Sequence, residues 1–194
     1  MKKTILLVCL AVLALGAIQA KPTLGVRAGL NVARLQLTAS EDGQNVGIDT
    51  ASSIGVHVGG FVQFLYPNKL MLQPELLFTQ KGTETGSSDE VTINYIAVPV
   101  LCKYDITLST IHLQPLVAPE IGYAISAKST YNEDFIDSIN RVNLGLNLGG
   151  DLVYKENYFM GLRYYMGLND LEKGAGKRPP ISNTCWSVSM GYLF

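Results

Sequence analysis

The stretch SSIGVHVGGFVQFLYPNKLMLQPELLFTQKG (residues 52–82) decides the fold of this chain. It contains two runs in which apolar residues alternate with small or polar ones, joined by Tyr66-Pro67-Asn68-Lys69. A period of two residues is typical of β-strands, and a Pro-Asn break between such runs indicates a tight hairpin. One face of this hairpin is apolar on both strands and the other is small or polar. This pattern favours a membrane β-barrel with lipid outside and a polar interior.

The same alternation recurs along the chain and predicts strands that are long enough to cross a bilayer when tilted. The eight predicted strands are Thr23–Leu35, Ser52–Leu65, Leu70–Gly82, Val91–Tyr104, Ile111–Ser126, Asn140–Tyr154, Tyr158–Leu168 and Thr184–Phe194. The connections between them are alternately long and short, so the tight turns all fall at one end. Outer-membrane barrels show this asymmetry, with short turns in the periplasm. We therefore predict an all-β fold, an eight-stranded antiparallel up-and-down transmembrane β-barrel.

Residues 1–20 have the features of a secretory signal peptide, because Lys2 and Lys3 precede an apolar run that is short for a membrane span. We expect cleavage after Ala20, which leaves residues 21–194 as one outer-membrane barrel domain in the cell outer membrane. The formal net charge of −1 argues against a nucleic-acid partner. We expect a monomer surrounded by outer-membrane lipid.

The prolines and cysteines inside the predicted strands lead to two further predictions, one on strand pairing and one on disulfide bonding. Proline cannot donate a hydrogen bond to a β-ladder, and in a closed barrel every strand is paired on both sides. We therefore expect β-bulges near the prolines, which are Pro74, Pro99, Pro115 and Pro119. Cys102 and Cys185 fall near opposite ends of their strands, so both are expected to be free thiols.

Several stretches resemble the PorT-like outer-membrane β-barrel family of small Bacteroidota-type proteins. They are GVRAGLNVARL (25–35), IGVHVGGFVQF with LMLQPELLFTQKG (54–82), YIAVPVLCKY (95–104), PEIGY (119–123), GLRYYMGLNDL (161–171) and the terminal SVSMGYLF. The most specific of these pieces is QPELLFTQKG. Ala97 departs from the family, which has an acidic residue there. The resemblance implies an outer-membrane barrel without implying a defined activity.

The candidate site consists of the charged residues at those alternate strand positions that face the interior of the predicted barrel. Charges inside a narrow barrel must be paired, because water has little access to them. We expect a salt-bridged plug that fills the lumen, since eight strands leave room for little beyond side chains. A proton path or small-solute route is the alternative. The residues of this lumen charge network are Arg27, Glu75, Lys81, Lys103, Glu120, Arg141, Asp151 and Arg163.

Aromatic residues near the strand ends fit membrane-interface girdles. Those of the periplasmic rim are Tyr66, Tyr104, Tyr154 and Phe194, and that of the outer rim is Trp186.

Catalytic, cofactor and metal sites are not indicated. His57 and His112 are the two histidines, and the spacing around them assembles no Ser-His-acid triad. Residues 173–178 resemble a phosphate loop superficially but lack its spacing and its following Ser or Thr. No His/Cys/Asp cluster has metal-ligand spacing. We therefore predict that the protein is not an enzyme and binds no cofactor.

The predicted role is structural or recognition-based and acts through four extracellular loops. One alternative is the barrel component of a protein-export or envelope machine, with an envelope protein as partner. Another is a membrane-embedded lipid-modifying enzyme. A soluble lipocalin-like barrel, the last alternative, would place the apolar parity inside.

Overall fold

A computed structural model describes residues 21–41, 44–49, 51–85, 89–129, 136, 139–169 and 182–194, which are almost entirely β-strand. The strands are β1 (Lys21–Glu41), β2 (Gln44–Asp49), β3 (Ala51–Leu65), β4 (Leu70–Thr85), β5 (Asp89–Tyr104), β6 (Ile106–Leu108), β7 (Ile111–Ser129), β8 (Val142–Tyr154), β9 (Tyr158–Gly167) and β10 (Ser182–Leu193). No helix in the described part of the chain is long and apolar enough to cross a membrane. The predicted signal peptide and the stretch 173–178 lie outside the described residues.

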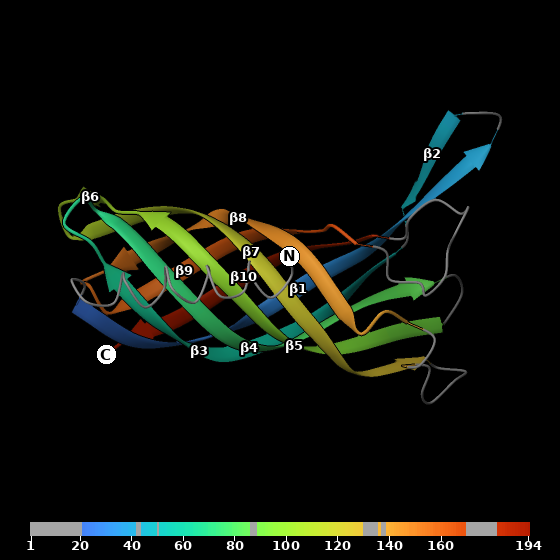
Figure 1. Cartoon of the computed structure of the whole chain (residues 1–194), viewed down its shortest axis with the longest axis horizontal. Coiled ribbons are helices and arrows are strands. Elements are labelled where there is room, and N and C mark those ends of the chain that lie inside the picture. The colour runs from blue at the N-terminus through green and yellow to red at the C-terminus, as the bar shows by residue number, and fades with distance from the viewer. Residues whose placement is uncertain are drawn as a thin grey trace, which may run out of the picture.

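Eight of these strands form the wall of a closed barrel, in the order β1-β3-β4-β5-β7-β8-β9-β10, with each antiparallel to its neighbours. The last strand pairs back with the first over a continuous ladder from Gly25↔Leu193 to Gln36↔Ser182, which closes the barrel. Figure 1 shows the resulting cylinder of tilted strands. The predicted eight-stranded antiparallel barrel is therefore confirmed.

The two ends of the barrel differ, as the loop lengths predict. The connections 66–69, 105–110 and 155–157 lie at one end, which we call the turn end (Figure 1). Lys69, Ser109, Lys155 and Glu156 have positive φ there, as tight turns require. At the opposite end, which we call the loop end, β1 runs on past Leu35 and pairs with β2. Together they form a two-stranded ribbon that projects beyond the wall (Figure 1).

Side chains of alternating parity face opposite sides of the wall. In β8, Val142, Leu144, Leu148 and Leu152 are 43–49% exposed, whereas Asn143, Asn147 and Asp151 between them are 1–5% exposed. The apolar parity therefore faces outward and the polar parity faces the lumen. A soluble lipocalin-like barrel would have the opposite arrangement, because its apolar residues would fill the core.

The prediction of bulges at the four prolines is wrong. Pairing of β4 with β5 and of β5 with β7 skips rungs beside Pro74, Pro99 and Pro119, and then resumes in the same register. Pro115 pairs with Gly150 within an unbroken ladder. Proline thus removes hydrogen bonds here without adding a residue to either strand. The register shifts lie elsewhere, between Ser52 and His57 and between Asn94 and Tyr95.

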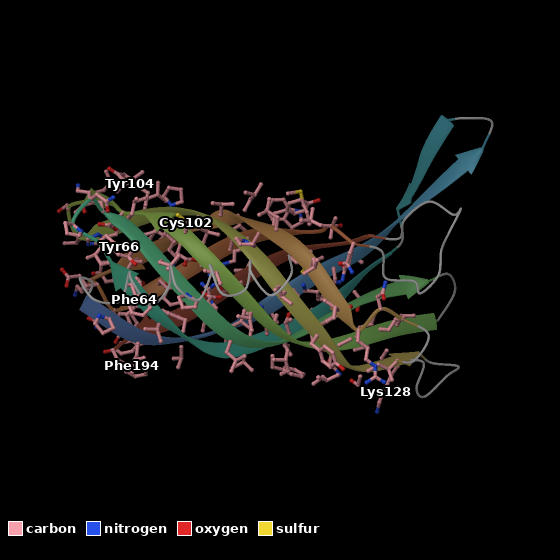
Figure 2. The ribbon with its side chains drawn as sticks, in the orientation of Figure 1. Phe64, Tyr66, Cys102, Tyr104, Lys128 and Phe194 are labelled. Carbon is pink, nitrogen blue, oxygen red and sulfur yellow. The ribbon has the colours of Figure 1, made fainter. Side chains whose placement is uncertain are left out.

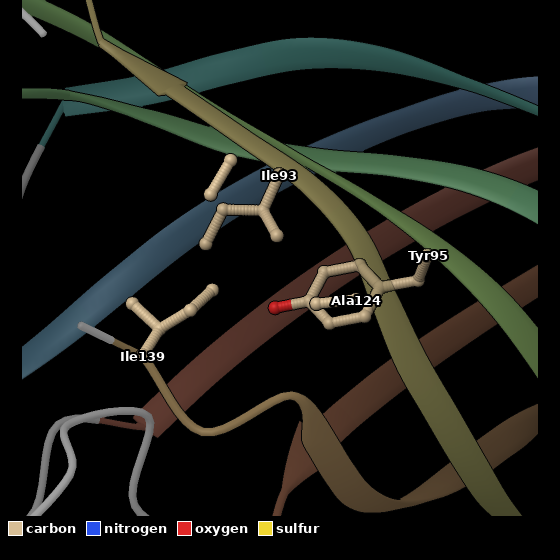
Figure 3. Packing of buried hydrophobic residues seen from close by; sticks show 5 residues of the cluster. Ile93, Tyr95, Ala124 and Ile139 are labelled. Atoms are coloured by element: carbon tan, nitrogen blue, oxygen red, sulfur yellow. The ribbon is translucent and has the colours of Figure 1, made fainter. Parts of the chain in front are cut away.

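Small apolar clusters lie near the two ends of the polar lumen. At the turn end, Phe61, Val153, Phe159 and Leu193 are buried together, and the rings of Phe61 and Phe159 meet edge to face at 5.7 Å. Near the loop end, a cluster that includes Ile93, Tyr95, Ala124 and Ile139 is buried (Figure 3). The charged side chains of the two ion-pair clusters described below lie in the layers between them.

Candidate functional site: the charge network of the lumen

Two carboxylates form the centre of the lumen, Glu75 from β4 and Asp151 from β8. Arg27 Nη1 lies 3.1 Å from Glu75 Oε1, and its Nη2 lies 3.2 Å from Asp151 Oδ1, so this one guanidinium joins both acids. Arg163 binds Glu75 through both Nη atoms at 2.8 and 3.0 Å. Lys103 Nζ lies 2.5 Å from Asp151 Oδ2. We call these five residues the central cluster.

The central cluster is held from all sides of the wall, because its members come from β1, β4, β5, β8 and β9. Each member is 1–4% exposed. Ions removed from water are tolerated only when they are paired and hydrogen-bonded, and here each carboxylate contacts at least two cations. Gln73 adds a further hydrogen bond to Glu75 at 2.6 Å. The side chains of the central cluster therefore constrain one another across the lumen.

A second ion pair lies nearer the loop end. Lys81 Nζ from β4 lies 3.0 Å from Glu120 Oε1 from β7, and Asn147 donates to the other carboxylate oxygen at 2.8 Å. The ammonium group of Lys81 also lies 3.3 Å from the ring centroid of Tyr165, a cation–π contact. Tyr165 in turn donates a hydrogen bond to Asn143. We call Lys81 and Glu120 with these neighbours the upper cluster.

The polar contacts of His57 define its tautomer. Its Nδ1 lies 2.9 Å from Asn31 Oδ1. The amide nitrogen of Asn31 donates to Thr79 Oγ1 and to the Gln80 carbonyl, each at 2.9 Å, so Asn31 presents its oxygen to the imidazole. His57 Nδ1 is therefore the protonated nitrogen, and its hydrogen-bond partner among the described residues is an Asn amide and not a Ser hydroxyl. His57 thus acts as a hydrogen-bonded component of the wall.

The structure brings seven of the eight predicted lumen charges into these two clusters, and it places Arg141 differently. Arg141 directly precedes β8 at the loop end and is partly exposed. Its carbonyl accepts a hydrogen bond from the Ala124 amide at 2.7 Å. The alternation predicts Arg141 as an inward strand residue, but the strand begins one residue later, at Val142.

The predicted girdle residues lie on the outer surface of the wall. Tyr104, Tyr154 and Phe194 are 46%, 45% and 72% exposed, and Tyr66 is partly exposed. Figure 2 shows Tyr66, Tyr104 and Phe194 at the turn end, with Lys128 at the opposite end. Trp186 is 52% exposed and packs against Tyr164, with ring centroids 4.8 Å apart.

A polar group that the sequence reasoning missed lies at the turn end. Asp105 accepts hydrogen bonds from His112 Nδ1 at 3.1 Å and from Thr107 Oγ1 at 3.0 Å, and Gln114 Nε2 lies 3.4 Å away. Burial raises the pKa of Asp105, but these hydrogen bonds outweigh burial and hold the pKa below its ordinary value of 3.8. The group borders a cavity of about 390 Å³ at the mouth of the barrel.

This group does not have the geometry of a catalytic triad. In a triad the histidine contacts the acid through one ring nitrogen and the nucleophile through the other. Here Thr107 Oγ1 lies 3.5 Å from His112 Nδ1, the same nitrogen that faces Asp105. The sequence contains one indication of this group. Asp105 begins a short turn and His112 is the first inward-facing residue after it, which places the two residues close together.

The two cysteines lie on opposite faces of the wall. Cys102 of β5 is exposed on the outer surface, and Cys185 of β10 is buried in the interior; both are free thiols.

Comparison with known proteins places the chain among outer-membrane barrels. Residues 20–173 match the model of the outer membrane protein beta-barrel domain. Neisserial surface protein A (NspA) is 13% identical, with 90% of this chain and 99% of that chain covered and a TM-score of 0.57. No curated protein is similar in sequence.

Two further solved structures cover similar shares of the chain. OprG from Pseudomonas aeruginosa is 11% identical, covers 91% of this chain and 97% of its own, and has a TM-score of 0.48. Ail of Yersinia pestis is 16% identical, covers 91% and 100%, and has a TM-score of 0.47. At these identities the likeness to NspA supports the fold alone. The family model, which covers most of the chain, shows that this protein belongs to the outer membrane protein beta-barrel domain family.

Proposed function

We propose that the protein is a small integral outer-membrane barrel with a plugged lumen, which acts as a structural or recognition element through the loops at its loop end. The observation that carries the plug is the central cluster. Its five charged side chains reach the lumen from five strands, and each is at most 4% exposed. A water-filled channel would leave such groups hydrated. Solute transport is therefore not the activity that this interior favours.

The recognition role is supported by the contrast between the two ends. The turn end has only short connections, whereas the β1–β2 ribbon extends the loop end beyond the wall (Figure 1). In outer-membrane barrels the long loops face the outside. The segments Gln36–Ala51 and Thr83–Glu90 contain three acidic residues each and no Lys or Arg. A surface of this kind suits contacts with cationic groups of a partner.

The remaining features describe how such a barrel would reach and occupy the membrane. The signal peptide at residues 1–20 would direct export, and the mature chain would sit as a monomer in outer-membrane lipid. The exposed aromatics Tyr66, Tyr104, Tyr154 and Phe194 would lie at the periplasmic interface, and Trp186 toward the outer one. Within the family, the stretch QPELLFTQKG supports a PorT-like relationship. The hydrogen-bonding pattern of His57 and His112 supports a non-enzymatic role.

Conductance across planar lipid bilayers tests the plug. We expect the wild-type barrel to give no stable ion current, whereas replacing Arg27, Glu75 and Arg163 together by Ser opens one. A barrel in which residues 37–48 are replaced by Asn-Gly is the matched control, since it changes the ribbon and leaves the lumen intact. A steady wild-type current as large as that of the triple variant would contradict the plug.

Affinity capture from native membranes in mild detergent tests the recognition role. We expect the full-length protein to retain an envelope or surface partner that the barrel with the shortened ribbon does not retain. Equal recovery by both proteins would contradict a role for the ribbon. N-terminal sequencing of the mature protein checks export, with Lys21 as the expected first residue.

A further inference from the structure

The charges in the middle of the lumen do not balance. Among the described residues of the wall, the two clusters contain four cations and three anions, each at most 7% exposed. The cations are Arg27, Lys81, Lys103 and Arg163, and the anions are Glu75, Glu120 and Asp151. A net charge is costly in a poorly hydrated interior, even where each ion has a partner. The Nε atoms of Arg27 and Arg163 are moreover buried without an acceptor. The interior therefore lacks one negative charge.

A small cavity lies where the two clusters approach each other. It has a volume of about 30 Å³, and its lining includes His57, Lys81, Glu120, Asn147, Arg163 and Ser187. A cavity of this size holds one or two particles as large as a water molecule. A polyatomic anion such as phosphate or sulfate does not fit, but a single halide ion does.

The lining of this cavity is electropositive. Both oxygens of Glu120 are engaged by its neighbours, Oε1 by Lys81 at 3.0 Å and Oε2 by Asn147 at 2.8 Å. Arg163 contributes a second cation to the lining, and its two Nη atoms reach toward Glu75 on the other side. Ser187 adds a hydroxyl group. A particle in the cavity therefore meets two cations and a donor beside one carboxylate that is already paired.

We propose that this cavity is a binding site for a small monovalent anion, which is chloride in the native envelope. One bound chloride makes the charges of the lumen equal, with four negative and four positive. A water molecule would leave the excess charge in place, and a sodium ion would increase it. The anion thus links the central and upper clusters and completes the packing of the lumen. The inference goes beyond the proposed function, because it holds whatever the loops recognise.

Anomalous diffraction from crystals grown in sodium bromide tests the site on the wild-type protein. Bromide replaces chloride in a site of this size and gives its own anomalous signal. We expect a peak in the cavity, next to the side chains of Lys81 and Arg163. Density in the cavity without an anomalous peak would identify water and overturn the proposal.

Thermal unfolding in chloride and in gluconate at equal ionic strength tests the site in solution. A ligand that binds only the folded state raises the unfolding midpoint with its concentration. We expect chloride to stabilise the barrel saturably, whereas gluconate is too large to enter. Ser187→Ala should weaken the effect of chloride, and Ser189→Ala is the matched control. Ser189 lies on the same strand, β10, and is buried, but it is not part of the cavity lining. Identical midpoints of the wild-type protein in the two salts would contradict the site.

Glu120→Gln distinguishes an anion from a cation by the direction of its effect. The substitution removes the negative charge of the lining and keeps the shape of the side chain. At separations of a few ångströms, we expect chloride to act at concentrations at least about tenfold lower than in the wild-type protein. A loss of the chloride effect in a folded Glu120→Gln barrel would contradict the proposal. If this variant does not fold, the bromide experiment still decides.

Discussion

Arg163 binds Glu75 through two parallel contacts across the lumen, with Nη1 2.8 Å from Oε2 and Nη2 3.0 Å from Oε1. The two residues are 88 positions apart in the sequence, and their strands, β9 and β4, are not neighbours in the wall. Bidentate pairs of this kind fix both distance and orientation. This contact therefore ties opposite sides of the barrel together, in addition to the ladders that tie adjacent strands.

Glu75→Gln should destabilise the barrel strongly. The substitution keeps the shape of the side chain but leaves Arg27 and Arg163 without their shared carboxylate. Removing one partner of a buried ion pair typically costs about 3–5 kcal/mol. We expect a loss of that size in the free energy of unfolding, measured by urea titration in detergent micelles. Glu156→Gln, in an exposed turn, is the control. A loss below about 1 kcal/mol would show that the pair contributes little.

Gly29→Ala and Gly60→Ala should differ sharply, although both glycines lie in neighbouring strands of the wall. A Cβ atom at Gly29 would lie 2.1 Å from the Val188 carbonyl oxygen and 2.6 Å from the His57 ring. At Gly60 the nearest atom would be 3.6 Å away. Overpacking costs about 1–3 kcal/mol, so we expect such a loss for Gly29→Ala and almost none for Gly60→Ala. Heat-dependent gel migration of the two variants checks this, and equal behaviour would contradict it.

Asp105 should make the barrel sensitive to acid. Its pKa in the folded state lies below the ordinary value of 3.8. The carboxylate therefore stabilises the fold fully above pH of about 4, and this contribution is lost as the pH falls through the folded-state pKa. We expect the unfolding free energy of the wild-type protein to decrease more steeply below that pH than that of Asp105→Asn. Parallel curves for the two proteins would contradict the assignment.

Spin labels should separate the two faces of the wall. Labels at Leu144 and Leu162, which are 43% and 51% exposed on the outer surface, should collide freely with oxygen dissolved in the lipid. A label at Asn147 faces the lumen and should be shielded from it. Reversed accessibilities, with water at the leucines and lipid at the asparagine, would mean that the inside and outside of the barrel had been exchanged.

The alternation predicts the wall well, because lipid on one side and a polar lumen on the other impose a period of two on every strand. Val142, Leu144, Leu148 and Leu152 show this, since all of them lie on the outer surface. The same reasoning misses β2. Residues 44–49 form β2, but they contain only two apolar residues, Val46 and Ile48, so the alternation there is too short to indicate a strand. The prediction of bulges at the prolines was wrong for another reason. A strand pair can leave out the hydrogen bonds beside a proline and keep its register, so no extra residue is needed.

The sequence predicts most of the residues of the lumen charge network, but it does not predict which of them form ion pairs with one another. Parity indicates which charges point inward, but the contacts depend on the tilt of the strands around the barrel. Arg27 meets Asp151, which is 124 residues away, and Glu75, which is 48 residues away. No local pattern relates these positions. Asp105 was missed because a carboxylate in a turn is ordinary, and its partner His112 becomes significant only when β6 folds back beside β7.

The skipped rungs of the wall fall close together. Those beside Pro74 separate β4 from both β3 and β5, those beside Pro99 also lie between β4 and β5, and those beside Pro119 separate β5 from β7. The junction of β1 with β10, in contrast, runs without a gap from Gly25 to Gln36. If this cylinder parts sideways under load, it should tear along the proline-bearing side and stay shut where its first and last strands join. The strand junctions that are easiest to separate are thus those around β4 and β5, in the middle of the sequence, and not the junction of the two terminal strands.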